Sequence, residues 1–154
     1  MSPSPTQPGG TPLIKYRVTV RFSDCDPLGH VNNAVYSTYI EQARIVLWRK
    51  QLGFELGKAG PSRSKRGEGF ILARTEIDFR SEAHDGEELE VRLSLVGFGR
   101  TSATYAYEIV EVSTGRLVAA ARTVQVWYDY DHAKPTPLTD ETKARLSKPV
   151  DEMR

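Results

Sequence analysis

Residues 24–33 are Asp24-Cys25-Asp26-Pro27-Leu28-Gly29-His30-Val31-Asn32-Asn33, and two residue patterns meet at this stretch. Before it, apolar and polar residues alternate over residues 14–22. This period of two predicts a half-buried strand. After it, apolar residues recur every three or four positions, at Tyr36, Ile40, Ala43 and Leu47. The stretch therefore lies between a strand and one central helix.

Both ends of this helix carry suitable residues. Asn32 or Asn33 is suited to cap its start, because an Asn side chain accepts a hydrogen bond from a backbone N–H left free in the first turn. Gly53 suits its end. The other side of the helix is polar and carries Glu41, Gln42, Arg44 and Arg49. Because Glu41 and Arg44 are three residues apart, we expect them to form a surface ion pair.

The rest of the chain is rich in strand patterns. Residues 57–69 contain glycine, proline, serine and basic residues, which predicts a loop. Four strands are predicted after it, over residues 70–80, 88–96, 101–112 and 117–128. Residues 83–86, 97–99 and 113–115 form short glycine-bearing connections, which favour hairpins and an antiparallel meander. The sequence thus predicts an α+β fold, with about five antiparallel strands and one long helix covering one face.

Length and composition narrow the class of protein. A chain of 154 residues suits one domain. We expect a disordered N-terminal tail over residues 1–12, the folded domain over 13–137 and a polar, partly helical tail over 138–154. Lys and Arg number 21 against 20 Asp and Glu, so no overall field attracts nucleic acid or an anionic membrane.

The single cysteine, Cys25, excludes an intrachain disulfide and a cysteine-rich zinc site. The sequence also contains no apolar run typical of a signal peptide or a membrane span. We therefore expect a cytoplasmic protein.

The side chains best suited to catalysis lie together in the stretch between the predicted strand and helix. Two carboxylates, one imidazole and two amides lie there within ten residues. A helix start offers free N–H groups and a positive dipole end, which stabilise an oxygen that gains negative charge. A carboxylate beside it acts as a nucleophile or activates water, so the pattern favours acyl transfer. The same residue types also serve purely structural roles in strand-to-helix turns, and the residues alone leave both roles open.

Residues 24–36, which continue the stretch with Ala34-Val35-Tyr36, resemble the signature of hotdog-fold thioesterases of the 4-hydroxybenzoyl-CoA thioesterase family. The His30-Val31-Asn32-Asn33 portion is also similar to acyl-ACP thioesterases. The order of strand, long helix, loop and four strands resembles the hotdog layout over about residues 13–137, with a sheet wrapped around one helix. The resemblance implies an acyl-CoA thioesterase that needs no metal or other cofactor.

The resemblance also implies roles for single residues. Asp26 matches the catalytic carboxylate, which acts as nucleophile or as base. The backbone N–H of Asn33 would hold the thioester carbonyl oxygen. His30 either assists the leaving thiolate or the water, or orders the loop. Leu28 stands where acyl-ACP thioesterases carry an Asn, which favours CoA over acyl carrier protein as the thiol.

Substrate binding and assembly complete the expectations. The phosphates of CoA require cations or free N–H groups, and Tyr36 is expected to line the acyl pocket. The candidate cations are Arg63, Lys65, Arg66 and Arg100. The resemblance implies a homodimer or homotetramer with sites formed between subunits, and exposed edge strands favour such pairing. Two alternatives to hydrolysis are a non-catalytic acyl-CoA-binding protein and an acyl-thioester hydratase or dehydratase.

Overall fold

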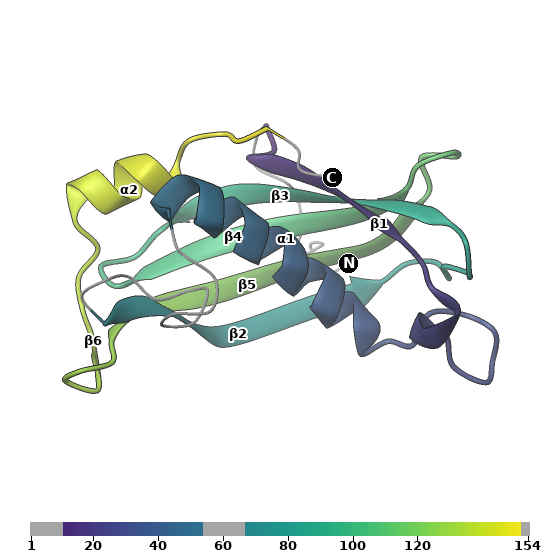
Figure 1. The fold of residues 1–154 in the computed structure, drawn as a ribbon, viewed down its shortest axis with the longest axis horizontal. Coiled ribbons are helices and arrows are strands. Elements are labelled where there is room, and N and C mark those ends of the chain that lie inside the picture. The colour runs from purple at the N-terminus through teal and green to yellow at the C-terminus, as the bar shows by residue number, and fades with distance from the viewer. Residues whose placement is uncertain (1–10, 54–66, 152–154) are drawn as a thin grey trace, which may run out of the picture.

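A computed structural model describes residues 11–53 and 67–151, in which a long helix crosses one face of an antiparallel sheet (Figure 1). The helices are α1 (Val35–Leu52), α2 (Asp140–Leu146) and the short 3-10 helix η1 (Phe22–Asp24). The strands are β1 (Ile14–Thr19), β2 (Glu68–Phe79), β3 (Glu88–Phe98), β4 (Ser102–Glu111), β5 (Leu117–Asp129) and β6 (Lys134–Pro135). This arrangement confirms the predicted α+β hotdog fold.

The strands lie in the order β1-β3-β4-β5-β2, and the two-residue strand β6 pairs with β5. β3, β4 and β5 form the predicted meander, joined by hairpins at residues 99–101 and 112–116. The predicted hairpin at residues 83–86 is wrong, because β2 pairs with β5 at one edge while β3 pairs with β1 near the other. A glycine-bearing turn predicts only that the chain changes direction. It does not determine whether the two strands that it joins pair with each other, because pairing depends on contacts between distant parts of the chain.

The apolar side of α1 packs on the inner face of the sheet. Trp48 of α1 stacks on Phe70 of β2 with ring centroids 4.7 Å apart, and its indole N–H donates to the hydroxyl of Tyr105, 3.1 Å away. Four alternate residues of β4 are completely buried, at Ala103, Tyr105, Tyr107 and Ile109. No helix within residues 11–53 and 67–151 is long and apolar enough to span a membrane.

The two ends of α1 differ in how well the sequence predicts them. Gly53 ends the helix in the left-handed region at φ +69°, and its N–H bonds the carbonyl of Arg49. At the start, the N-cap is Ala34, which has no capping side chain. Asn32 instead accepts a hydrogen bond from the N–H of Ala34 at 3.0 Å. The expected asparagine cap therefore serves the turn before the helix rather than its first turn.

Arg44 does not lie on the polar surface of α1, so the expected ion pair with Glu41 is wrong. Glu41 is exposed, whereas Arg44 is buried between the helix and the sheet. Its Nη1 lies 3.4 Å from the hydroxyl of Tyr107, and its guanidinium carbon lies 5.6 Å from the Trp48 ring centroid. The buried side of α1 therefore includes Arg44 as well as its apolar residues. The sheet accommodates this polar side chain because the hydroxyl of Tyr107 lies opposite it.

The segment after Pro137 also packs on the domain. Leu138 and Leu146 are buried in the core. The side-chain amide of Gln51, near the end of α1, donates to the carbonyls of Leu146 at 3.0 Å and Lys148 at 2.8 Å. α2 is thereby attached to the end of the long helix.

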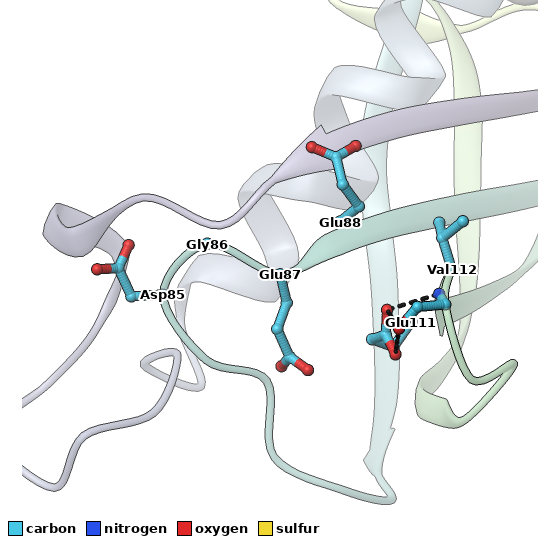
Figure 2. A pocket seen from close by; sticks show the side chains of 7 residues that line it. Asp85, Gly86, Glu87, Glu88, Glu111 and Val112 are labelled. Atoms are coloured by element: carbon cyan, nitrogen blue, oxygen red, sulfur yellow. Dashed lines mark hydrogen bonds between the residues drawn. The ribbon is translucent and has the colours of Figure 1, made fainter.

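The turn from β4 to β5 is organised by one carboxylate. Glu111 accepts hydrogen bonds from the backbone N–H and the hydroxyl of both Ser113 and Thr114, at 2.7–3.1 Å. Figure 2 shows this carboxylate directed back toward its own turn. The donors of Ser113 and Thr114 favour the charged form and lower the pKa of Glu111 from 4.5 to about 2.

We expect Glu111→Gln to destabilise the protein at pH 7, with a loss that shrinks as pH falls from about 4.5 toward 2. A lowered folded-state pKa stabilises the protein above the unfolded pKa, and the benefit disappears as the wild-type carboxylate becomes protonated. Urea unfolding at pH 7 and pH 3 measures the difference. Glu108→Gln on the same strand is the control. A difference from wild type that is equal at both pH values would contradict the assignment.

Candidate active site

The stretch after β1 folds into a small loop that presents Asp26. An isolated β-bridge pairs Cys25 with Val31 and closes the loop. Inside it, the N–H of Asp26 donates to the carbonyl of His30 at 3.0 Å, and the N–H of Gly29 donates to the carbonyl of Asp26 at 3.0 Å. Gly29 has φ +88°, a conformation that glycine adopts without strain. The chain direction thus reverses around Asp26.

The Asp26 carboxylate is oriented by its own loop. Oδ1 accepts a hydrogen bond from the N–H of Leu28 at 2.9 Å. Oδ2 lies 3.8 Å from Nδ1 of His30, and the Asp26 side chain remains 20% exposed. This separation is too long for a hydrogen bond, but it lets a protonated imidazole attract the carboxylate. One carboxylate oxygen is therefore held, while the other faces His30.

His30 is also positioned by the backbone. Its Nδ1 lies 3.2 Å from the carbonyl of Val31. In the neutral tautomer that donates this hydrogen bond, Nε2 is the nitrogen that accepts a proton. The geometry suits both roles considered for His30, since the same contact orders the loop and selects the tautomer.

One backbone N–H at the approach to α1 has no partner in the described part of the chain. The N–H of Asn32 donates to the carbonyl of Asp24, and the N–H of Val35 donates to the carbonyl of Asn32, each at 2.9 Å. The N–H of Ala34 is taken by the Asn32 side chain. Among the described residues, nothing accepts a hydrogen bond from the N–H of Asn33. This group is a donor fixed beside a helix start, as stabilisation of an oxyanion requires.

The Asp24 side chain connects the Asp26 loop to helix α1 by hydrogen bonds. Its Oδ2 accepts from the Tyr39 hydroxyl at 2.7 Å and from the N–H of Arg21 at 3.0 Å, and Oδ1 accepts from Nη2 of Arg21 at 3.0 Å. Burial opposes the charged form of Asp24, but these hydrogen bonds outweigh it and lower the pKa. Burial and the adjacent carboxylate raise the pKa of Tyr39, which therefore stays a donor. The buried carboxylate is thus structural, and it links the Asp26 loop to α1.

The other residues expected at the site fall into three groups. Tyr36 is buried at the start of α1, with its ring centroid 5.6 Å from that of Phe79. Arg100 is exposed and follows the end of β3, whose first residues lie beside Val20. An eleven-residue strand is about 36 Å long, so the end of β3 lies far from the Asp26 loop, at the opposite end of the sheet (Figure 1), and Arg100 follows that end by two residues. The remaining candidates, Arg63, Lys65 and Arg66, lie outside the described residues.

A partly uncovered strand was not anticipated from the sequence. Leu72 and Phe79 of β2 pair in register with Gln125 and Ala119 of β5, and paired residues share a face of the sheet. The β5 residues are buried, whereas Leu72 is 52% and Phe79 49% exposed. The alternating pattern of β2 predicts which of its residues lie on the inner face. Only the position of α1 in the structure shows that the helix leaves part of this face exposed to solvent.

A surface hollow of about 520 Å³ lies where β3 begins and β4 ends (Figure 2). It is lined by Asp85, Gly86, Glu87, Glu88, Glu111, Val112 and Ser113. Its acidic lining repels the phosphates of a nucleotide-bearing substrate, so this hollow does not suit CoA. Within residues 11–53 and 67–151, the His, Cys, Asp and Glu side chains form no group of three able to hold a metal ion.

We expect Tyr39→Phe to lower the free energy of unfolding by about 1–3 kcal/mol, because the substitution removes a buried hydrogen bond to a charged carboxylate. Urea unfolding at pH 7 measures the loss. Tyr128→Phe is the matched control, because no hydrogen bond of the Tyr128 hydroxyl occurs in the described part of the chain. Equal stability of the two variants would show that the Asp24–Tyr39 contact does not hold the loop to the helix.

Comparison with known proteins gives consistent matches over most of the chain. Residues 20–146 match the family model of the thioesterase-like superfamily. YsmA, an uncharacterized protein of Bacillus subtilis, is 27% identical over 130 residues, which are 84% of this chain and 82% of YsmA.

Two solved structures share the fold. A thioesterase from Thermus thermophilus, complexed with coenzyme A and zinc, is 32% identical with a TM-score of 0.70, and the match covers 88% of this chain and 92% of that protein. Slr0204 from Synechocystis, a 1,4-dihydroxy-2-naphthoyl-CoA thioesterase, is 23% identical with a TM-score of 0.74, covering 86% and 93%. At the identity of Slr0204, the match shows the fold alone.

Proposed function

The chain belongs to the thioesterase-like superfamily and is a thioester hydrolase, and from this premise we propose that it hydrolyses an acyl-CoA to a free acid and CoA. The observation that carries the proposal is the N–H of Asn33, which has no acceptor within residues 11–53 and 67–151 and lies beside the loop that presents Asp26. The coenzyme A bound to the Thermus thermophilus thioesterase supports CoA as the thiol.

The proposed reaction begins with the carbonyl oxygen of the thioester at the N–H of Asn33. The Asp26 carboxylate takes a proton from water as the water oxygen bonds to the carbonyl carbon. The negative charge moves onto the carbonyl oxygen, where the N–H and the dipole of α1 stabilise it. When the C=O bond re-forms, the C–S bond breaks, and the CoA thiolate takes up the proton that Asp26 removed from water, directly or through the neighbouring imidazole of His30.

A nucleophilic route uses the same residues. Asp26 would attack the carbonyl carbon and expel the thiolate, and water would then hydrolyse the resulting anhydride. In a single turnover in ¹⁸O-water, the base route puts all label into the product acid, whereas attack of water on the Asp26 carbonyl of the anhydride puts label into Asp26. Label in the Asp26 carboxylate, found by mass spectrometry of the peptide, would establish the nucleophilic route.

The proposal includes pairing of two copies along β2. Within the described residues, β2 pairs with β5 on one side only, so its outer edge offers unpaired backbone groups. Antiparallel pairing of two β2 strands reverses the second sheet. The end that carries Arg100 in one copy then lies on the same side of the dimer as the Asp26 loop of the other. Arg100 would bind CoA phosphate across the interface, and Arg63, Lys65, Arg66 and Tyr36 remain proposed substrate contacts.

We expect Asp26→Asn to lower kcat by at least about 100-fold, because an amide neither accepts the proton of water nor attacks the carbonyl. Release of free thiol from a panel of acyl-CoAs, followed with a thiol reagent, measures the loss. Asn33→Ala should keep most of the activity, since the proposed contact is made by the backbone. Asp85→Asn controls for loss of an acid elsewhere. Unchanged activity of Asp26→Asn would remove this carboxylate from the mechanism.

A further inference from the structure

Arg44 is a buried cation that has no carboxylate partner within residues 11–53 and 67–151. Only 6% of it is exposed, and no Asp or Glu in the described part of the chain forms an ion pair with it. Its contacts are the Tyr107 hydroxyl and the face of Trp48, while its Nε makes no hydrogen bond. Removal of a charge from water is costly unless an opposite charge and hydrogen bonds compensate it. The site therefore lacks an anionic partner.

The side chains around Arg44 add a second unused donor. The Tyr107 and Thr123 hydroxyls are 2.7 Å apart, and Thr123 donates to Oε1 of Gln125 at 3.1 Å. Gln125 is 1% exposed, and its Nε2 has no hydrogen-bond partner among the residues that the structure describes. We call Arg44, Tyr107, Thr123 and Gln125 the Arg44 cluster. Its unsatisfied atoms are both donors, so the group it lacks is a hydrogen-bond acceptor.

The Arg44 cluster lies beside the uncovered face of β2. Gln125 is paired in register with Leu72, and Thr123 with Thr75. Leu72 and Thr75 are exposed although their partners are buried. A ligand lying along this face therefore passes next to the Arg44 cluster.

The same helix connects the Arg44 cluster with the proposed reaction centre. Arg44 is nine residues after Val35, a distance of about 14 Å along the helix axis. Side chains on a helix lean toward its N-terminus, which brings the guanidinium closer to the N–H of Asn33. An acyl group held at that N–H and extended along α1 has its far end near the Arg44 cluster.

We propose that the Arg44 cluster binds a carboxylate at the far end of the acyl group, so that the preferred substrates are CoA thioesters of dicarboxylic acids. This inference rests on the proposed function and names its substrate class. A carboxylate supplies the missing charge and accepts from a guanidinium through two oxygens. A hydroxyl would leave the charge unpaired, and a plain alkyl chain would leave both donors unsatisfied.

The test compares acyl-CoAs of equal chain length with and without the terminal carboxylate. The pairs are glutaryl with pentanoyl, adipoyl with hexanoyl, and suberoyl with octanoyl-CoA, and thiol release gives kcat/KM for each. We expect the wild-type protein to prefer the dicarboxylic member at least tenfold in one pair. Arg44→Met should bring that ratio to about one or below. Arg49→Met, on the same helix, should keep the wild-type ratio.

Each other outcome leads to a decision. If wild type releases thiol from the plain acyl-CoAs and shows no preference at any length, the inference fails and the proposed function stands. If no acyl-CoA in a broad panel releases thiol, the proposed function itself fails. If Arg44→Met does not fold, as judged by circular dichroism, Arg44→Lys keeps the charge without the planar fork and should reduce the ratio. A variant that keeps the ratio but loses the dimer would show that a second copy's carboxylate meets Arg44, which overturns the inference.

Discussion

One long helix, α1, has to cover the inner face of five long strands, and the rest of the structure depends on how much of that face it covers. The aromatic contacts of Trp48 with Phe70 of the edge strand β2 and with Tyr105 of β4 fix the C-terminal half of α1 on the sheet. Farther along β2, Leu72 and Phe79 stay half exposed on the face that β5 buries. A helix is about 10 Å wide, whereas strands are spaced about 4.8 Å apart, so one helix leaves an edge strand open. The open strand is the surface available to a substrate and to a second copy.

Acyl transfer adds a second constraint, because the carboxylate and the oxyanion donor lie on different elements. Asp26 belongs to a loop closed by its own hydrogen bonds, and Asn33 precedes the helix. The buried Asp24 carboxylate joins them through Tyr39 of α1 and through Arg21. Stabilisation of a transition state depends on donors that are already in place. A structural carboxylate therefore determines the position of the proposed catalytic one.

Two of the places where the described residues leave hydrogen-bond donors without acceptors lie along α1. Before α1, the N–H groups of Asn32 and Ala34 have local acceptors, as does that of Val35 at its first residue, whereas that of Asn33 has no acceptor among the described residues. Beneath the helix, Arg44 and Gln125 have donors without acceptors in the described part of the chain. Buried polar groups are normally paired, so an unpaired donor points to a partner outside the chain. Both places lie along α1, one for the reacting carbonyl and one for the proposed far end of the acyl group.

The sequence by itself determined the elements, because residue periodicity is a local property. Alternation over residues 14–22 and helical spacing from Tyr36 to Leu47 located β1 and α1, and Gly53 marked the end of the helix. The resemblance of residues 24–36 to hotdog thioesterases also pointed to the correct family, and Asp26 remains a prediction from it. Only the tertiary structure decided which strands pair, which is why the expected hairpin at residues 83–86 failed. It also decided that Arg44 turns inward, because the hydroxyl that meets its guanidinium comes from a strand more than sixty residues away in the chain.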